Sequence, residues 1–219
     1  MTRPLNPEQR SVFLLISVLA FLILTPFLEG NPTGEVFIIL ALYLTLISAT
    51  AELHEKRVLF RSAIPIAVAS MVLISASHFY PSRPLLLANN IVLASFLCLV
   101  SVSLFAYLGK PGAITKGRLY VCVALYLLIG LSWFALYQII DLLQPGSFAE
   151  AGVTLAGRIP PSKLLYFSLA SLTTLGYGDV VAVRPAARMM ATLEAAAGVL
   201  YIAITVARLV AGYQTSNHK

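Results

Sequence analysis

The stretch SLTTLGYGDV, residues 171–180, decides the fold of this chain, because it places flexible and polar residues inside an otherwise apolar sequence. Two adjacent threonines, two glycines on either side of a tyrosine and one aspartate fall within these ten residues. The stretch ends a mostly apolar segment, KLLYFSLASLTT (163–174), and a long apolar run at 186–212 follows it. The rest of the chain must explain why such a segment interrupts the apolar sequence.

The composition places the chain in a lipid bilayer. Of its 219 residues, 59% are hydrophobic and 11% are charged, and the mean hydropathy is +0.88, whereas soluble domains carry about 25% charged residues. The net charge of +6 comes from short basic clusters between apolar runs. This pattern is typical of membrane topology and not of a nucleic-acid surface. We therefore expect an integral membrane protein in contact with membrane lipid, with no nucleic-acid partner.

Six apolar runs are long enough to cross a bilayer, which takes about 20 apolar residues. The runs cover residues 11–28, 36–53, 58–79, 85–108, 119–143 and 186–212. The first run is expected to be a retained helix, because it is long and ends without a small-x-small cleavage pattern. Cys98 and Cys122 lie inside two of the runs and are expected to be buried packing residues.

Basic residues alternate between the connecting segments. The N-terminus and the segments 52–61 and 109–118 carry most of the lysines and arginines, whereas 29–35 carries two glutamates and 80–84 one arginine. Under the positive-inside rule, the N- and C-termini are then both cytoplasmic. The expected location is the cell (plasma or inner) membrane, as a multi-pass protein.

The segment between the fifth and sixth runs does not fit a simple outer loop. Pro160 and Pro161 indicate a helix start, at which Ser162 is expected to cap the free backbone amides. The apolar residues that follow are too few to cross the bilayer and too apolar to stay in water, so they predict a re-entrant helix. Non-helical backbone at membrane depth is tolerated only where it is buried in protein or lines a watery cavity. The returning strand, 174–179, is therefore expected to line a pore.

Glycine at alternate positions gives this strand an unusual backbone. Gly176 and Gly178 accept backbone angles that other residues avoid, so successive carbonyl groups can turn to one side. Several copies around an axis would stack rings of carbonyl oxygens that can replace the hydration shell of a monovalent cation, and the Thr174 hydroxyl could supply one more ring. The helix before the strand would aim the negative end of its dipole at the cavity beneath.

The motif TTLGYGD resembles the selectivity filter of tetrameric potassium channels, whose loops read TVGYG. The resemblance covers an outer helix, turret, pore helix, filter and inner helix, roughly residues 117–212. It implies an all-α integral membrane protein with six transmembrane helices plus a re-entrant pore helix and an extended selectivity filter. The chain holds one filter motif, and four surround the ion in this family, so the resemblance implies a homotetramer. The filter residues implied to bind K⁺, in the order of the chain, are Thr174, Leu175, Gly176, Tyr177 and Gly178.

The same resemblance assigns roles around the filter. Asp179 is expected to accept a hydrogen bond from Tyr166, while Phe167 adds to an aromatic cuff. Gly198 lies twenty residues after Gly178, the spacing of the hinge glycine in simple potassium channels. The inner-helix residues expected to line the cavity are Val199, Ile202, Ala203 and Val206.

Glu194 is the one acidic residue inside the sixth run, where an unpaired charge is costly. We expect it to support the filter from behind through hydrogen bonds to hydroxyl groups. The hydroxyl groups at that level belong to Ser168, Ser171 and Thr173. The sequence leaves open whether the Glu194 carboxyl is ionised, protonated or paired with an arginine.

Residues 1–116 are expected to form a four-helix N-terminal transmembrane domain and residues 117–219 a pore domain. This is the layout of voltage-gated channels, whose fourth helix carries regularly spaced arginines. The fourth run here, 85–108, contains no arginine or lysine. We therefore expect no conventional voltage sensor.

The expected function is passive, potassium-selective conduction, with K⁺ as the permeant ion and no cofactor. Two alternatives stay open: a non-conducting membrane scaffold or regulatory subunit that keeps the pore fold, and a weakly selective cation channel. The histidines are scattered and no serine or cysteine has a base at a suggestive spacing, so we do not expect an enzyme. No soluble regulatory domain is expected in this chain, and the gating stimulus is open.

Overall fold

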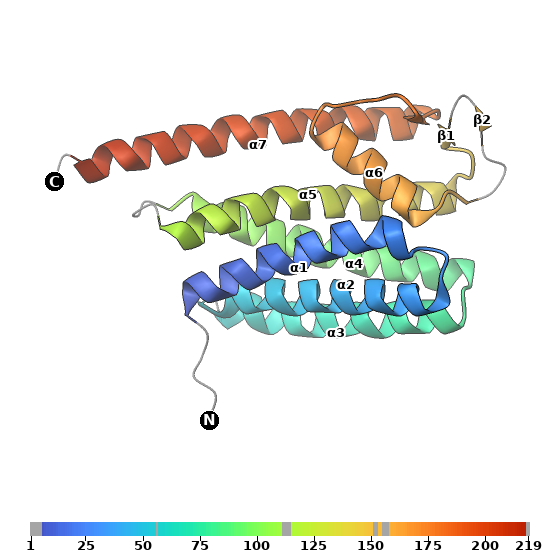
Figure 1. The fold of residues 1–219 in the computed structure, drawn as a ribbon, viewed down its shortest axis with the longest axis horizontal. Coiled ribbons are helices and arrows are strands. Elements are labelled where there is room, and N and C mark those ends of the chain that lie inside the picture. The colour runs from blue at the N-terminus through green and yellow to red at the C-terminus, as the bar shows by residue number, and fades with distance from the viewer. Residues whose placement is uncertain (1–5, 56, 111–114, 151–152, 155–157, 218–219) are drawn as a thin grey trace.

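Six long helices dominate the computed structural model, which describes residues 6–55, 57–110, 115–150, 153–154 and 158–217 (Figure 1). Each of the six is long and apolar enough to cross a membrane, which confirms the predicted number of spans and the all-α membrane architecture. These helices are α1 (Pro7–Leu28), α2 (Pro32–Glu52), α3 (Arg57–Phe79), α4 (Arg83–Leu108), α5 (Lys116–Leu143) and α7 (Pro185–Asn217).

The helices begin a few residues before the apolar runs that predicted them, because polar residues and prolines start them. Pro7 and Pro32 lie in the first turn, where a missing N–H removes no helical hydrogen bond. The side chain of Asn31 accepts a hydrogen bond from the Thr33 amide, and that of Thr115 accepts one from the Arg118 amide. A short 3₁₀ turn, η1 (Leu53–Glu55), follows α2.

Helix α5 lies at the centre of the molecule. Helices α1 and α4 both pack against it, while α2 packs mainly on α1 and α3 on α4. The twelve-residue helix α6 (Pro161–Leu172) lies between α5 and α7, at an angle to both (Figure 1). The core is continuous through these layers: Phe96 of α4, Leu125 of α5 and Leu164 of α6 are all fully buried.

A small antiparallel sheet joins the end of α5 to the start of α7. Its strands are β1 (Phe148–Glu150), β2 (Val153–Thr154) and β3 (Val180–Ala182), in the order β2-β1-β3. Ala149 lies opposite Thr154 on one side and Val181 on the other. The Val183 amide also donates to the Ser147 carbonyl at 2.8 Å. The sheet therefore fixes the far end of the segment that follows α6.

Two expectations about single residues are wrong. Helix α6 has Pro160 as its N-cap, and the Ser162 hydroxyl donates to the Glu29 carboxylate instead of capping its own helix. Ser162 is the second residue of α6 and so lies inside the helix, past the capping position, and the turn after α1 brings the Glu29 carboxylate to it. Cys122 is buried as expected, but Cys98 is exposed. Cys98 lies on the same face of α4 as the exposed Ile91 and Val102, at helical spacing.

Candidate functional site

The segment that follows α6 is exposed along its whole length. Residues 173–179 form seven consecutive exposed positions between the buried Leu172 and the buried Val180. Leu175 is 55% exposed and Tyr177 is 70% exposed, although both are large apolar side chains. Figure 1 shows the segment turning back from the end of α6 toward the strands. Backbone and side chains are thus both open to contacts outside this single chain.

The backbone of the segment alternates between left-handed and right-handed conformations. The φ angle is positive at Thr174 (58°), Gly176 (52°) and Gly178 (81°), and it is negative at the residues between them. A β-branched residue such as threonine is strained at positive φ, so the surrounding structure must hold Thr174 there. Alternating right- and left-handed residues turn successive peptide groups to the same side, in contrast to a β-strand.

Four consecutive amides of the segment bond back to the end of α6. The Thr173 and Thr174 amides donate to the Leu169 and Ser171 carbonyls, at 3.1 and 2.9 Å. The Leu175 and Gly176 amides both donate to the Ala170 carbonyl, at 2.8 and 3.3 Å. In a trans peptide group the carbonyl points opposite to the amide. The carbonyls of Thr173, Thr174 and Leu175 therefore point away from α6.

The two adjacent aromatic residues of α6, Tyr166 and Phe167, make different contacts. The Tyr166 hydroxyl of α6 donates to Asp179 at 3.0 Å, which is the pair expected from the sequence. Phe167 is buried, with its ring centroid 5.1 Å from that of Tyr137 and 5.3 Å from that of Phe148. These edge-to-face contacts join α5, α6 and β1 into one rigid aromatic cluster.

Glu194 of α7 is fully buried behind α6. Its two carboxyl oxygens contact the Tyr137 hydroxyl at 2.5 Å and the Ser168 hydroxyl at 2.6 Å. Ser168 is one of the three partners expected from the sequence, whereas the Thr173 hydroxyl donates to its own helix, at the Leu169 carbonyl. Tyr137 was not expected, because it lies 57 residues before Glu194 in the chain.

Two glycines allow the helices to approach α6 closely. A Cβ atom on Gly198 would lie 2.0 Å from the Leu172 carbonyl oxygen, and one on Gly130 would lie 2.9 Å from a methyl carbon of Leu169. Helix α7 runs through Gly198 without a break. The structure thus gives Gly198 a packing role at the end of α6, and its role as a hinge stays a prediction.

The expected cavity-lining side chains share one face of α7. Their spacing of three and four residues places them on one side of a helix, and all of them are exposed in the single chain. Val199, Ile202 and Val206 are each about half exposed. The residues on this face are Val199, Ile202, Ala203 and Val206.

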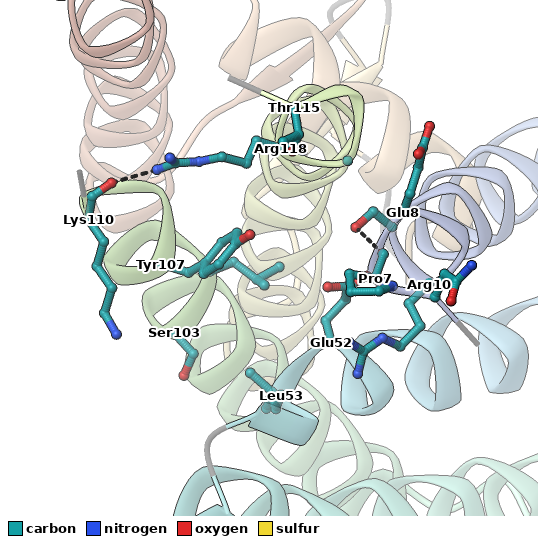
Figure 2. A pocket seen from close by; sticks show the side chains of 14 residues that line it. Pro7, Glu8, Arg10, Glu52, Leu53, Ser103, Tyr107, Lys110, Thr115 and Arg118 are labelled. Atoms are coloured by element: carbon teal, nitrogen blue, oxygen red, sulfur yellow. Dashed lines mark hydrogen bonds between the residues drawn. The ribbon is translucent and has the colours of Figure 1, made fainter. Parts of the chain in front are cut away.

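A cavity of about 540 Å³ lies at the opposite end of the molecule, among the ends of α1, α2, α4 and α5 (Figure 2). The Arg118 guanidinium donates to the Leu108 and Lys110 carbonyls and lies over the Tyr107 ring. Glu8, Arg10 and Glu52 also line it. Within the described part of the chain, no group of three or more histidine, cysteine, aspartate or glutamate residues is placed to hold a metal ion.

The fold defines a helical membrane protein with six helices long enough to span a bilayer, and comparison with known proteins finds a family match in its C-terminal part. Residues 121–214 match the family model described as "Ion channel". An 86-residue stretch, 39% of this chain, is 29% identical to the inward rectifier potassium channel Kirbac3.1 of Paramagnetospirillum magnetotacticum. The match spans a quarter of that relative's length. No solved structure matches. Both similarities are to ion channels, and the relative is a potassium channel.

Proposed function

We propose that this chain is one subunit of a homotetrameric, potassium-selective channel. Residues 117–219 form its pore domain, in which α5 is the outer helix, α6 the re-entrant pore helix and α7 the inner helix. The filter is Thr174 to Gly178. The observation that carries the proposal is the alternating φ of this segment, together with the Leu175 and Gly176 amides bonded to α6, which turn the Thr174 and Leu175 carbonyls away from that helix.

The backbone geometry suits the coordination of K⁺. With four copies around an axis, the carbonyls of Thr174, Leu175, Gly176 and Tyr177 form stacked rings that replace the hydration shell of the ion. The Thr174 hydroxyl supplies one more ring. The bonds from the Leu175 and Gly176 amides to Ala170 keep the carbonyls of the two preceding residues directed at the axis. K⁺ is the permeant ion, and the function requires no cofactor.

The exposed apolar residues of the pore domain favour assembly. Leu175 and Tyr177 are open in the single chain, and large exposed apolar surfaces mark contact sites. In the tetramer, neighbouring subunits cover these side chains. The face of α7 with Val199, Ile202 and Val206 surrounds the cavity below the filter. Because it is apolar, this face is suited to gate the pore by dewetting.

The N-terminal half is proposed to be a four-helix transmembrane domain, residues 1–116, without a conventional voltage sensor. Helix α4 carries its one basic residue, Arg83, at its first position. The Arg83 guanidinium donates to the Leu142 carbonyl at the end of α5, at 3.0 and 2.7 Å. This charge therefore anchors α4 to the outer helix. Both termini are placed on the cytoplasmic side of the cell membrane, which puts the filter toward the outer side.

Reconstitution of the full chain in liposomes tests the proposal. We expect a tetramer by size, K⁺ flux well above Na⁺ flux, and block by Ba²⁺. Equal K⁺ and Na⁺ flux would instead identify a weakly selective cation channel. A stable tetramer without flux would identify a scaffold or regulatory subunit.

Gly176→Ala is the matched control for the filter. No atom lies within 4 Å of a Cβ atom at this position, so the variant meets no steric clash in the single chain. Alanine is nevertheless strained at a φ of 52°, which only glycine adopts freely. We expect the variant to assemble normally and to lose K⁺ flux.

A further inference from the structure

Three fully buried polar side chains meet behind the filter segment. Glu194 comes from α7, Tyr137 from α5 and Ser168 from α6, and each side chain has essentially no exposed surface. Ser168 lies six residues before Thr174, a separation that would be roughly 9 Å along a helix. The cluster therefore joins the proposed outer and inner helices to the pore helix close to the filter. Ion coordination itself does not use these side chains.

The number of hydrogen bonds that this cluster can form depends on whether the Glu194 carboxyl carries a proton. The Ser168 hydroxyl oxygen lies 2.7 Å from the Gly130 carbonyl and 2.6 Å from a Glu194 carboxyl oxygen. A serine hydroxyl has a single proton, whereas a carbonyl and an ionised carboxylate only accept hydrogen bonds. With an ionised Glu194, one of the two contacts of Ser168 would have no proton between its oxygens.

A protonated carboxyl satisfies every contact. Glu194 then donates from one oxygen to Ser168, and Ser168 donates to the Gly130 carbonyl. The other Glu194 oxygen accepts from the Tyr137 hydroxyl, at 2.5 Å. Each proton is used once, and no buried donor of the cluster is left without an acceptor.

Within the described ranges, no basic side chain bonds to the Glu194 carboxyl, whose partners there are the Tyr137 and Ser168 hydroxyl groups. An unpaired buried charge is strongly unfavourable. Helix α5 presents the titratable Tyr137 and, further along, Tyr126, whose hydroxyl donates to the Leu172 carbonyl. Helix α6 presents the non-titratable Ser168. The sequence left open a pairing of Glu194 with an arginine, and the described residues show no such pair.

We propose that Glu194 is a buried proton-binding site, held in its neutral form, whose proton completes a hydrogen-bonded link from α7 through α6 to α5. When that proton is lost, the Ser168 hydroxyl can donate to the carboxylate or to the Gly130 carbonyl, but not to both. In either case one interhelical hydrogen bond next to the filter is lost and a buried charge remains. Alkaline pH then loosens the pore helix. This consequence for conduction rests on the proposed channel function, whereas the protonation itself does not.

Infrared spectroscopy of the purified full chain tests the protonation directly. We expect the C=O band of a protonated carboxyl group at neutral pH in the native chain, and its absence in Glu194→Gln. Tyr137→Phe should shift this band, because the carbonyl oxygen loses a donor, while the carboxyl stays protonated. Absence of the band from the folded native chain would overturn the proposal, whether or not the protein conducts.

The pH dependence of K⁺ flux is the functional readout. Between about pH 6 and about pH 10, a range that spans the unperturbed values of histidine and tyrosine, native flux should fall severalfold with rising pH. Glu194→Gln keeps an uncharged side chain that donates and accepts, so it should conduct throughout the range without that fall. The same alkaline fall in both proteins would show that another group is responsible and would overturn the proposed link to the filter. Absence of flux in both, with the infrared band present, would reject the channel function and retain the proton site.

Discussion

The two halves of the molecule use buried polar groups in different ways. In the N-terminal helices, buried hydroxyls mostly bond to their own helix, as Thr25 does to the Phe21 carbonyl and Thr45 to the Ala41 carbonyl. In α5, α6 and α7, several buried polar groups bond from one helix to another. The Tyr137 hydroxyl donates to Glu194, and the Tyr201 hydroxyl donates to the Cys122 carbonyl at 2.7 Å.

This difference separates the helices that must keep a fixed register from those that need only pack. A hydroxyl that donates to a carbonyl of its own helix has its hydrogen bond within that helix, and this bond does not restrict how the helix shifts against its neighbours. A bond between helices is lost when either helix moves, so it fixes their relative positions. The proposed filter requires such precision, because its carbonyls depend on where α6 ends.

The largest expected effect comes from breaking the contact between α6 and α7. In Gly198→Ala, the new methyl group would lie 2.0 Å from the Leu172 carbonyl oxygen, and backbone on both helices must move. Overpacking typically destabilises by about 1–3 kcal/mol, and we expect at least the upper end of that range here. The yield of folded tetramer after purification in detergent measures it.

Gly117→Ala, at the start of α5, is the control for this substitution. A Cβ atom there would come no closer than 3.4 Å to any neighbour, which is ordinary contact. Alanine also favours a helix over glycine by about 1 kcal/mol, so this variant should be at least as stable as the native chain. Equal yields from both variants would contradict a tight register at Gly198.

An intermediate effect is expected where the two halves meet at Glu29. Its carboxylate accepts hydrogen bonds from the Ser162 amide, at 3.2 Å, and from the Ser162 hydroxyl, at the N-terminus of α6. A negative charge at a helix N-terminus stabilises by about 0.3–1 kcal/mol. Glu29→Gln should therefore lower the thermal unfolding temperature modestly while the fold is kept.

Glu35→Gln is the comparison for this residue. Glu35 lies on the next helix, α2, where its side chain is partly exposed and lies 3.4 Å from a ring nitrogen of His78. Even a charged pair at the surface is worth only about 0–1 kcal/mol, and the contact with His78 does not involve α6. A larger loss from Glu35→Gln than from Glu29→Gln would show that the bond to α6 does not stabilise the junction between the halves.

The sequence predicts the spans well and the contacts between them poorly. Apolar runs and proline starts place all six long helices within a few residues, because each helix is decided by its own segment. Glu194 was recognisable as an acidic residue at the level of α6, so Ser168 could be named as a partner. Tyr137 could not, because the rotation of α5 against α7 is set by packing and not by local sequence. The bond between Glu29 and Ser162 was missed for the same reason, since 133 residues separate the two.

The smallest expected effect tests the N-terminal half, within one helix. Thr45 of α2 is fully buried, and its hydroxyl donates at 2.9 Å to Ala41, a carbonyl of its own helix. Thr45→Val keeps the shape of the side chain and removes only this local bond, so we expect the free energy of unfolding to change by less than about 0.5 kcal/mol.

Tyr43, on the same helix, instead donates to the Met71 carbonyl of α3 at 2.7 Å. Tyr43→Phe should cost about 1 kcal/mol, because it removes a bond between helices. If thermal unfolding shows Thr45→Val to be as damaging as Tyr43→Phe, then bonds within a helix matter as much as bonds between helices, and the contrast between the two halves loses its physical basis.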